Sequence, residues 1–249
     1  MLTQRHSHSS ERTSLAQCLH GEATLHAMTL TPSLHVKSFE LGDFATNGFV
    51  VFDSSDAGKS CWIVDCPYEP GAMIDFILHE GLKPELCILT HCHCDHIAGL
   101  GEMRLKLGPV PVLCHVLEKD FNQDPNLNLS AFIPPGIRAP EVEGYLAHGQ
   151  LMQLPGLGAY TFQMVHVPGH SPGMLTLWCA DAAIAIVGDT LFEGSIGRTD
   201  FPTSDPDAMT RSLQLLMTLP DATRIYPGHG RETTILQERQ TNPYLRGLV

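Results

Sequence analysis

The chain has no apolar run long enough to cross a membrane, since no stretch approaches the roughly 18 consecutive apolar residues of a transmembrane helix. Positive charge is also scarce: 15 lysines and arginines stand against 27 aspartates and glutamates, which gives a net charge of −12. Such an excess of negative charge makes non-specific binding to a phosphate backbone unfavourable. We therefore expect neither a membrane protein nor a nucleic-acid-binding protein.

Patterned cysteines are lacking as well. The eight cysteines form no C-x-x-C pair of the kind that holds a structural zinc ion, and no secretory signal precedes them. We therefore expect reduced thiols in a cytoplasmic protein. Cys92 and Cys94 are interpreted as small side chains that face the core, in preference to a catalytic role.

The length and layout predict one folded domain after a tail. Residues 1–31 contain no long apolar run and no clear period, so we predict a flexible tail there. Residues 32–249 are enough to bury one sizeable core, as a monomer or a dimer. Within them, short apolar or alternating runs alternate with amphipathic ones, which predicts an α/β protein. The predicted strands are 34–39, 48–52, 62–64, 86–89, 160–167 and 174–179, and the predicted helices are 70–80, 97–107 and 205–217.

A cluster of metal-ligand residues follows the predicted strand 86–89. His91, His93, Asp95 and His96 fall within six positions. Neutral imidazoles and carboxylates are the usual ligands of zinc-like and iron-like cations. The carboxyl end of a strand is also where α/β proteins usually build active sites. The segment therefore predicts a metalloenzyme.

Three further candidates lie far down the chain in similar surroundings. His170, Asp189 and His229 each follow a short apolar strand and a turn that contains glycine. Glycine there allows the backbone to approach a metal closely. The other histidines, His166 among them, match no such motif and are interpreted as structural.

The seven candidates are too many for one tetrahedral ion, whereas two ions that share a carboxylate would use them all. Two cations about 3.5–4 Å apart can hold a water between them and lower its pKa towards about 7, which provides a hydroxide nucleophile. Zinc, iron and manganese all accept these ligands. We assign His91, His93 and His170 to a first ion and Asp95, His96 and His229 to a second, with Asp189 bridging both.

The ligand order resembles a known signature. H-x-H-x-D-H followed by a distant His, Asp and His is similar to the signature of the metallo-β-lactamase superfamily, and the resemblance covers roughly residues 32–240. It implies a four-layer αββα sandwich with the metals at one edge of the two sheets. The bridging Asp189 argues against β-lactam hydrolysis, because the members with that activity generally lack it.

Two longer segments narrow the resemblance. The strings from Gly188 to Pro202 and from Tyr226 to Gly230 resemble the glyoxalase II-like, or hydroxyacylglutathione hydrolase-like, branch. That branch implies hydrolysis of a thioester such as S-lactoylglutathione by a metal-bridging hydroxide, with Asp95 and Asp189 catalytic. Arg198 would contact the substrate. A structural pair with Asp200, which stands where the branch has an aromatic residue, is an equal alternative.

Other activities remain open. Persulfide dioxygenases resemble the same branch and would hold one iron through His91, His170 and Asp189. A lactonase or another ester hydrolase of the superfamily is a further alternative. The segment 122–140, which contains several prolines and asparagines, is predicted to be an insertion or a substrate loop.

Overall fold

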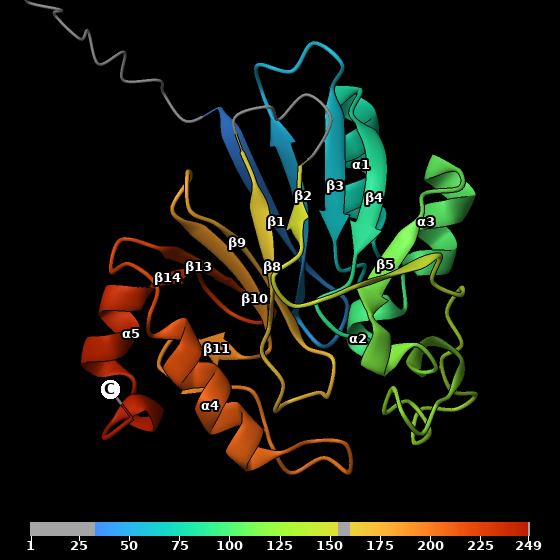
Figure 1. Ribbon diagram of the computed structural model, residues 1–249. Coiled ribbons are helices and arrows are strands. Elements are labelled where there is room, and N and C mark those ends of the chain that lie inside the picture. Colours follow the sequence, from blue (N-terminus) through green and yellow to red (C-terminus); the bar gives the residue numbers. More distant parts are fainter. Residues whose placement is uncertain (1–32, 154–159, 249) are drawn as a thin grey trace, which may run out of the picture. The chain divides into compact units, whose positions relative to one another are not determined.

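Two six-stranded sheets form the centre of the fold in a computed structural model that describes residues 33–153 and 160–248 (Figure 1). The predicted tail, residues 1–31, lies outside the described residues. The first sheet has the order β1-β2-β3-β4-β5-β6 and the second the order β14-β13-β10-β9-β8-β7. The strands of the first sheet are β1 (Leu34–Leu41), β2 (Thr46–Asp53), β3 (Ser60–Val64), β4 (Lys83–Ile88), β5 (Val112–His115) and β6 (Gly144–Leu146).

The second sheet and a small hairpin come from the later part of the chain. The hairpin pairs Leu191 with Ile196 across a two-residue turn in which Gly194 has a φ of +66°. The strands of the second sheet are β7 (Leu151–Met152), β8 (Phe162–His166), β9 (Leu175–Cys179), β10 (Ile184–Gly188), β13 (Arg224–Pro227) and β14 (Thr233–Thr234), and those of the hairpin are β11 (Leu191–Phe192) and β12 (Ser195–Ile196).

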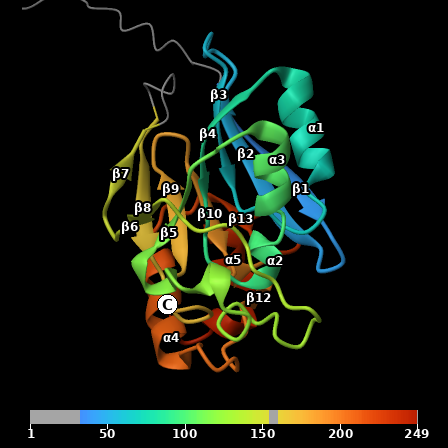
Figure 2. The same ribbon diagram turned by 90° about the vertical axis from the view of Figure 1, so that its right-hand side faces the viewer.

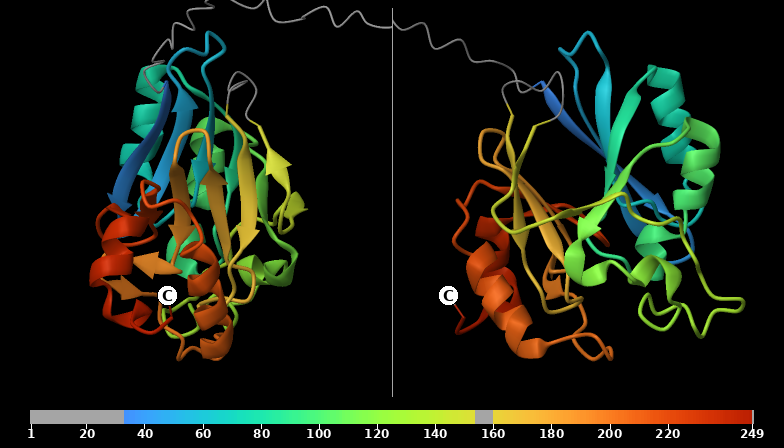
Figure 3. Two further views of the ribbon diagram at one scale, coloured as in Figure 1. Left: turned by 60° about the vertical axis from the view of Figure 1, so that its left-hand side comes forward. Right: turned by 45° about the vertical axis from the view of Figure 1, so that its right-hand side comes forward.

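Helices cover the outer faces of both sheets (Figures 2 and 3). Helices α1 (Gly71–Glu80) and α3 (Leu100–Leu107) pack on the first sheet, and α4 (Pro206–Leu216) and α5 (Ile235–Thr241) pack on the second. No helix in the described ranges is both long and apolar enough to span a membrane.

Strand alternation divides the core into three apolar layers. On neighbouring positions of β2, Val50 faces the helices and Val51 faces the second sheet. On β3, Ile63 faces the helices and Trp62 faces the second sheet. Successive side chains of a strand point to opposite faces, so a strand that is apolar throughout is buried on both. The predicted four-layer αββα sandwich is confirmed.

Two helix ends agree with the sequence prediction. Gly81 follows α1 in the left-handed conformation with a φ of 65°, and its N–H bonds back to the last turn. Asp205 caps α4 by accepting a hydrogen bond of 2.9 Å from the N–H of Ala208. Both ends lie close to the bounds of the predicted helices 70–80 and 205–217, because caps are set by local sequence.

The predicted helix 97–107 is wrong in its extent. A short helix α2 (Cys94–Ile97) begins inside the ligand cluster, and α3 starts only at Leu100. The helix is interrupted at Gly99, whose N–H donates a hydrogen bond of 2.9 Å to the carbonyl of Cys66. A Cβ atom on Gly99 would lie 2.2 Å from the carbonyl oxygen of Pro67. This close approach of two loops, which is a tertiary contact, decides the break.

Candidate metal centre

The seven residues predicted from the sequence lie together at one edge of the two sheets. Strands β8 and β10 both run antiparallel to β9, and β13 runs parallel to β10. Their carboxyl ends therefore meet at the same edge, where they position His170, Asp189 and His229. Strand β4 of the facing sheet ends there as well, followed by the turn with His91 and His93 and by α2 with Asp95 and His96.

The side chains form groups small enough to hold a metal ion. In each group the ligand atoms lie within 4.8 Å of one another. A first ligand group consists of His91, His93 and His170, and a second of Asp95, His96 and His229. These are the two sets assigned from the sequence, although their role as ligands stays a prediction. Among the described residues, His91, His96 and Asp189 form another such group, which lies between the first two.

Asp189 faces both ligand groups. Its Oδ1 lies 3.5 Å from Nε2 of His96, which belongs to the second group. Its Oδ2 lies 3.5 Å from Nε2 of His170 in the first group and 3.4 Å from Nε2 of His229 in the second. A carboxylate in this position has the geometry of a bridging ligand.

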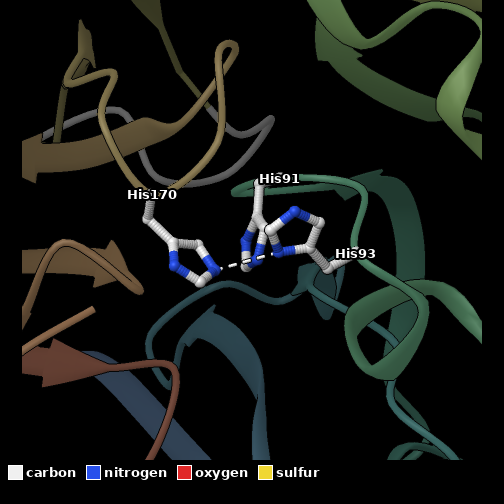
Figure 4. A group of neighbouring side chains, drawn as sticks. All are labelled: His91, His93 and His170. Atoms are coloured by element: carbon white, nitrogen blue, oxygen red, sulfur yellow. Dashed lines mark hydrogen bonds between the residues drawn. The ribbon is translucent and has the colours of Figure 1, made fainter. Parts of the chain in front are cut away.

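The first ligand group converges from two loops (Figure 4). His93 Nδ1 lies 2.9 Å from His170 Nε2, so two ring nitrogens from different loops point at one region. The opposite nitrogen of His170, Nδ1, lies 2.9 Å from the carbonyl oxygen of Arg198. Because a carbonyl can only accept, Nδ1 carries the proton and Nε2 presents a lone pair.

Several buried polar atoms in the centre have no hydrogen-bond partner among the described residues. They are Nε2 of His91, His93 and His96, together with Oδ1 of Asp189. A buried polar atom without a partner costs about 1–3 kcal/mol, and native proteins contain few of them. Nε2 of His91, Nε2 of His96 and Oδ1 of Asp189 belong to residues that form one group and fit a divalent cation as the missing partner, whereas His93 directs its other nitrogen, Nδ1, at His170.

Charge in the centre also fits cations. Burial alone would raise the pKa of Asp95, yet His96 and His229 lower it to about 2. Burial likewise opposes ionisation of Asp189, but His96 and His229 hold its pKa well below the usual range. The two carboxylates in turn raise the pKa of His229 to about 10 and that of His96 well above its usual range, against the effect of burial. In the absence of metal, protons supply the positive charge that the carboxylates attract.

The histidines of the first ligand group behave in the opposite way. Burial lowers the pKa of His93 to about 3, that of His91 well below its usual range, and that of His170 to a smaller extent. These imidazoles are therefore neutral near neutral pH, the form that binds a metal.

Asp65 is an important residue of the centre that sequence reasoning missed. It is fully buried and directly follows β3. Its carboxylate accepts hydrogen bonds of 2.7 Å from the N–H and from the hydroxyl of Thr90, and lies 2.8 Å from Nδ1 of His96. It thus fixes the ring of His96 with Nε2 towards the centre. Its place one residue after a predicted strand was the signal that could have found it.

The second ligand group has a support of its own on β2. Thr46, the first residue of that strand, donates a hydrogen bond of 3.0 Å to Oδ2 of Asp95. Asn47 donates to the carbonyls of Pro227 and Gly230, at 2.9 and 3.0 Å, and so holds the turn that carries His229. Neither residue stands out in the sequence, because each acts from a distant strand.

A cavity of about 390 Å³ opens beside the centre and has a mainly apolar wall. Leu129 and Ile133 of the predicted substrate loop contribute to this wall. Cys94 also lines the cavity, so its interpretation as a core residue is only partly right, whereas Cys92 is in the core. The other apolar residues of the wall are Phe44, Phe192 and Phe201.

Arg198 lies at the same cavity and is already paired. Its guanidinium donates two hydrogen bonds of 2.8 Å to the carboxylate of Asp200 and stacks over Phe201 at 4.4 Å. The pair with Asp200, which was the structural alternative for Arg198, is therefore present in this structure. The predicted contact of Arg198 with substrate stays a prediction.

Comparison with known proteins places this architecture in a family. Residues 41–229 match the family model described as the metallo-beta-lactamase superfamily. The chain belongs to this superfamily. The fold and its relatives thus identify the protein as a metallo-hydrolase. The histidine–aspartate cluster has the composition of a divalent-metal site.

Two curated relatives cover most of the chain. One is the probable metallo-hydrolase YqgX of Bacillus subtilis, 37% identical over 191 residues, which are 75% of this chain and 88% of the relative. The other is the hydroxyacylglutathione hydrolase GloC of Haemophilus influenzae, 30% identical over 223 residues, which are 85% of this chain and 98% of the relative.

Two solved structures share the fold at similar identity. BLEG-1, a B3 metallo-beta-lactamase, superposes with a TM-score of 0.78 at 33% identity, covering 86% of this chain and all of that one. TTHA1623 in a di-iron-bound form superposes with a TM-score of 0.72 at 34% identity, covering 84% of this chain and all of that one.

Proposed function

We propose that this protein is a binuclear metal-dependent hydrolase that cleaves a thioester such as S-lactoylglutathione. The observation that carries the proposal is the carboxylate of Asp189, which has one oxygen towards His96 and the other towards His170 and His229. The hydroxyacylglutathione hydrolase GloC among the relatives supports the choice of a thioester. The di-iron form of TTHA1623 supports two metals, for which zinc, iron and manganese are candidates here.

The ligand residues would divide the work between the two ions. The first ligand group would hold one ion, the second ligand group the other, and Asp189 both. When bound, two divalent cations lower the pKa of a shared water and polarise the carbonyl of the substrate.

The protein's own groups would orient the attack. Asp95, held by Thr46 and ionised with a pKa of about 2, can accept a hydrogen bond from the attacking water. A thiolate leaves readily, so the reaction needs no strong general acid. Cys94 is not the nucleophile, because burial raises its pKa to about 11 and keeps it a thiol at neutral pH.

The cavity beside the centre indicates which kind of substrate group fits there. Its wall of Phe44, Leu129, Ile133, Phe192 and Phe201 favours an apolar group next to the scissile bond. A thioester with an apolar acyl group is therefore a useful second substrate beside S-lactoylglutathione.

The dioxygenase alternative needs a different metal centre. One iron would be held by His91, His170 and Asp189. In this structure His170 Nε2 lies 3.5 Å from Oδ2 of Asp189, and His91 shares one group within 4.8 Å with His170 and another with Asp189. The geometry accommodates this set as well, so the choice of a hydrolase rests on the relatives YqgX and GloC, and an assay of oxygen consumption distinguishes the two activities.

The test is hydrolysis of S-D-lactoylglutathione by protein purified with its native metals, followed by the loss of thioester absorbance. We expect a turnover of about 10 per second, typical of enzymes. Asp95→Ala and Asp189→Ala should lose most of it. The control is Asp181→Ala, an exposed aspartate in the turn before β10, at the opposite end of that strand from Asp189.

Two results would overturn the proposal. One is full activity of metal-reconstituted Asp189→Ala. The other is no hydrolysis of either thioester by metal-replete protein. In the second case, oxygen consumption with glutathione persulfide would identify the dioxygenase, and turnover of a lactone or a β-lactam would identify another hydrolase of the superfamily.

A further inference from the structure

Glu118 is a buried carboxylate outside the seven predicted ligands. It ends the short 3-10 helix Val116–Glu118 that follows β5, and only 1% of its surface is exposed. No lysine, arginine or histidine of the described chain forms an ion pair with it. A buried carboxylate without a cation is costly, so its hydrogen bonds have to compensate.

These hydrogen bonds join the two loops of the first ligand group. Oε2 accepts from the N–H of Cys92 at 2.5 Å, and Cys92 lies between His91 and His93. Oε1 accepts from the hydroxyl of Ser171 and from the N–H of Gly173, the latter at 2.9 Å. Ser171 directly follows His170.

Gly173 permits the close approach of this carboxyl group. A Cβ atom on Gly173 would lie 2.7 Å from Cγ of Glu118. The loop after His170 can therefore close on Glu118 only because that position has no side chain. A backbone hydrogen bond of 2.8 Å from Leu175 to Thr90 joins the same loops, but Leu175 lies five residues after His170, whereas Ser171 directly follows it.

We propose that Glu118 is a positioning residue that sets the spacing between the His91–His93 turn and the His170 loop, and so controls metal affinity at the first ligand group. This inference rests on the proposed binuclear centre. Ligand distances have to be correct to about 0.2 Å, so a small change in loop spacing weakens the site. The second ligand group depends on Asp65, Thr46 and Asn47 instead, and loss of Glu118 leaves it in place.

The chain provides a matched control in Glu238. This carboxylate is also fully buried, and it accepts from the hydroxyl of Thr233 at 2.6 Å, the side chain of Asn242 at 2.8 Å and the N–H of Gly194 at 2.9 Å. It contacts none of the seven predicted ligands through these bonds. In both glutamates each oxygen accepts a hydrogen bond, so a glutamine places an NH₂ group against a donor in either case.

The experiment compares Glu118→Gln and Glu238→Gln by competition for Zn²⁺ with a chromophoric chelator, together with the denaturant midpoint of each variant. We expect Glu118→Gln to lose about 10–100-fold in affinity for one of the two ions, as is typical for partners that orient metal ligands. Its affinity for the other ion should be unchanged. Glu238→Gln should unfold at a lower denaturant concentration and bind both ions as the wild type does.

Ser171→Ala provides a second test if Glu118→Gln does not fold. It removes one donor to Glu118 and should weaken the same ion by a smaller factor. Equal weakening of both ions by Glu118→Gln, or equal effects of Glu118→Gln and Glu238→Gln on affinity, would overturn the inference. A wild type that binds a single ion would instead refute the binuclear proposal, and Glu118 would then be judged by its effect on that ion.

Discussion

Gly228 is a position at which one added methyl group should disturb the carboxylate of Asp189 directly. A Cβ atom there would lie 2.1 Å from Oδ1 of Asp189 and 2.9 Å from Cε1 of His96. Gly228 is not among the glycines with a positive φ, so alanine suits its backbone. The added Cβ would also lie 3.2 Å from the backbone carbon of Gly188, so Gly228→Ala acts mainly on the centre and only slightly on the neighbouring strand end.

The size of the effect follows from these distances. A Cβ atom essentially never lies closer than 3.0 Å to a heavy atom of another residue, so Oδ1 of Asp189 has to move away by about 0.9 Å. Metal ligands tolerate about 0.2 Å, and a misplacement of about 1 Å near the chemistry can cost about 100-fold in rate. We expect Gly228→Ala to lose about 100-fold in kcat/KM for thioester hydrolysis and to bind fewer than two metal ions.

The assay combines thioester hydrolysis with metal content by elemental analysis. Gly101→Ala is the control, because Gly101 lies in α3 with no atom within 4 Å of an added Cβ. It should keep both metals and full activity. Wild-type turnover and two bound ions in Gly228→Ala would refute the role given to the Asp189 carboxylate.

Two further predictions concern protons. Because His229 has a pKa of about 10 and that of His96 is also raised, both histidines are protonated without metal. Loading Zn²⁺ near neutral pH should therefore release about two protons per chain. An indicator dye in weak buffer measures this release, and its absence would contradict the prediction. Burial lowers the pKa of His115 to about 4, so the unfolded chain takes up a proton first and stability falls as pH drops from about 6.5 towards 4. His115→Phe should flatten that fall in the free energy of unfolding, measured by urea denaturation in chelator, by roughly 2–3 kcal/mol; identical pH profiles would contradict it.

Most of the fold could be predicted because its signals are local. The alternating run that starts at Leu34 and the capped helix that starts after Asp205 both lie where the pattern placed them. The break at Gly99 could not be predicted in this way. It depends on the carbonyl groups of Cys66 and Pro67, which come from a different loop.

In the candidate site, too, the residues with local signals could be predicted and those that depend on tertiary contacts could not. The ligand candidates could be named because their chemistry and their place after strands are visible in short segments. The residues that orient them were missed. Asp65, Thr46 and Glu118 are ordinary polar residues in the sequence, and each reaches the centre from a strand or turn remote from the ligand that it holds.

The centre is built from groups that are costly to bury, and this explains its place in the fold. Unpartnered imidazole nitrogens, Asp65 and Glu118 all lie at or near zero exposure. Such groups are tolerated where three apolar layers already hold the strand ends in place. The sandwich thus supplies the rigidity, and the loops at its edge carry unsatisfied lone pairs that a cation can use. Because the hydrogen bonds of Asp65 and Glu118 hold the ligand-bearing segments before any ion arrives, little binding energy is spent on arranging them, and the main cost is the displacement of the protons on His96 and His229.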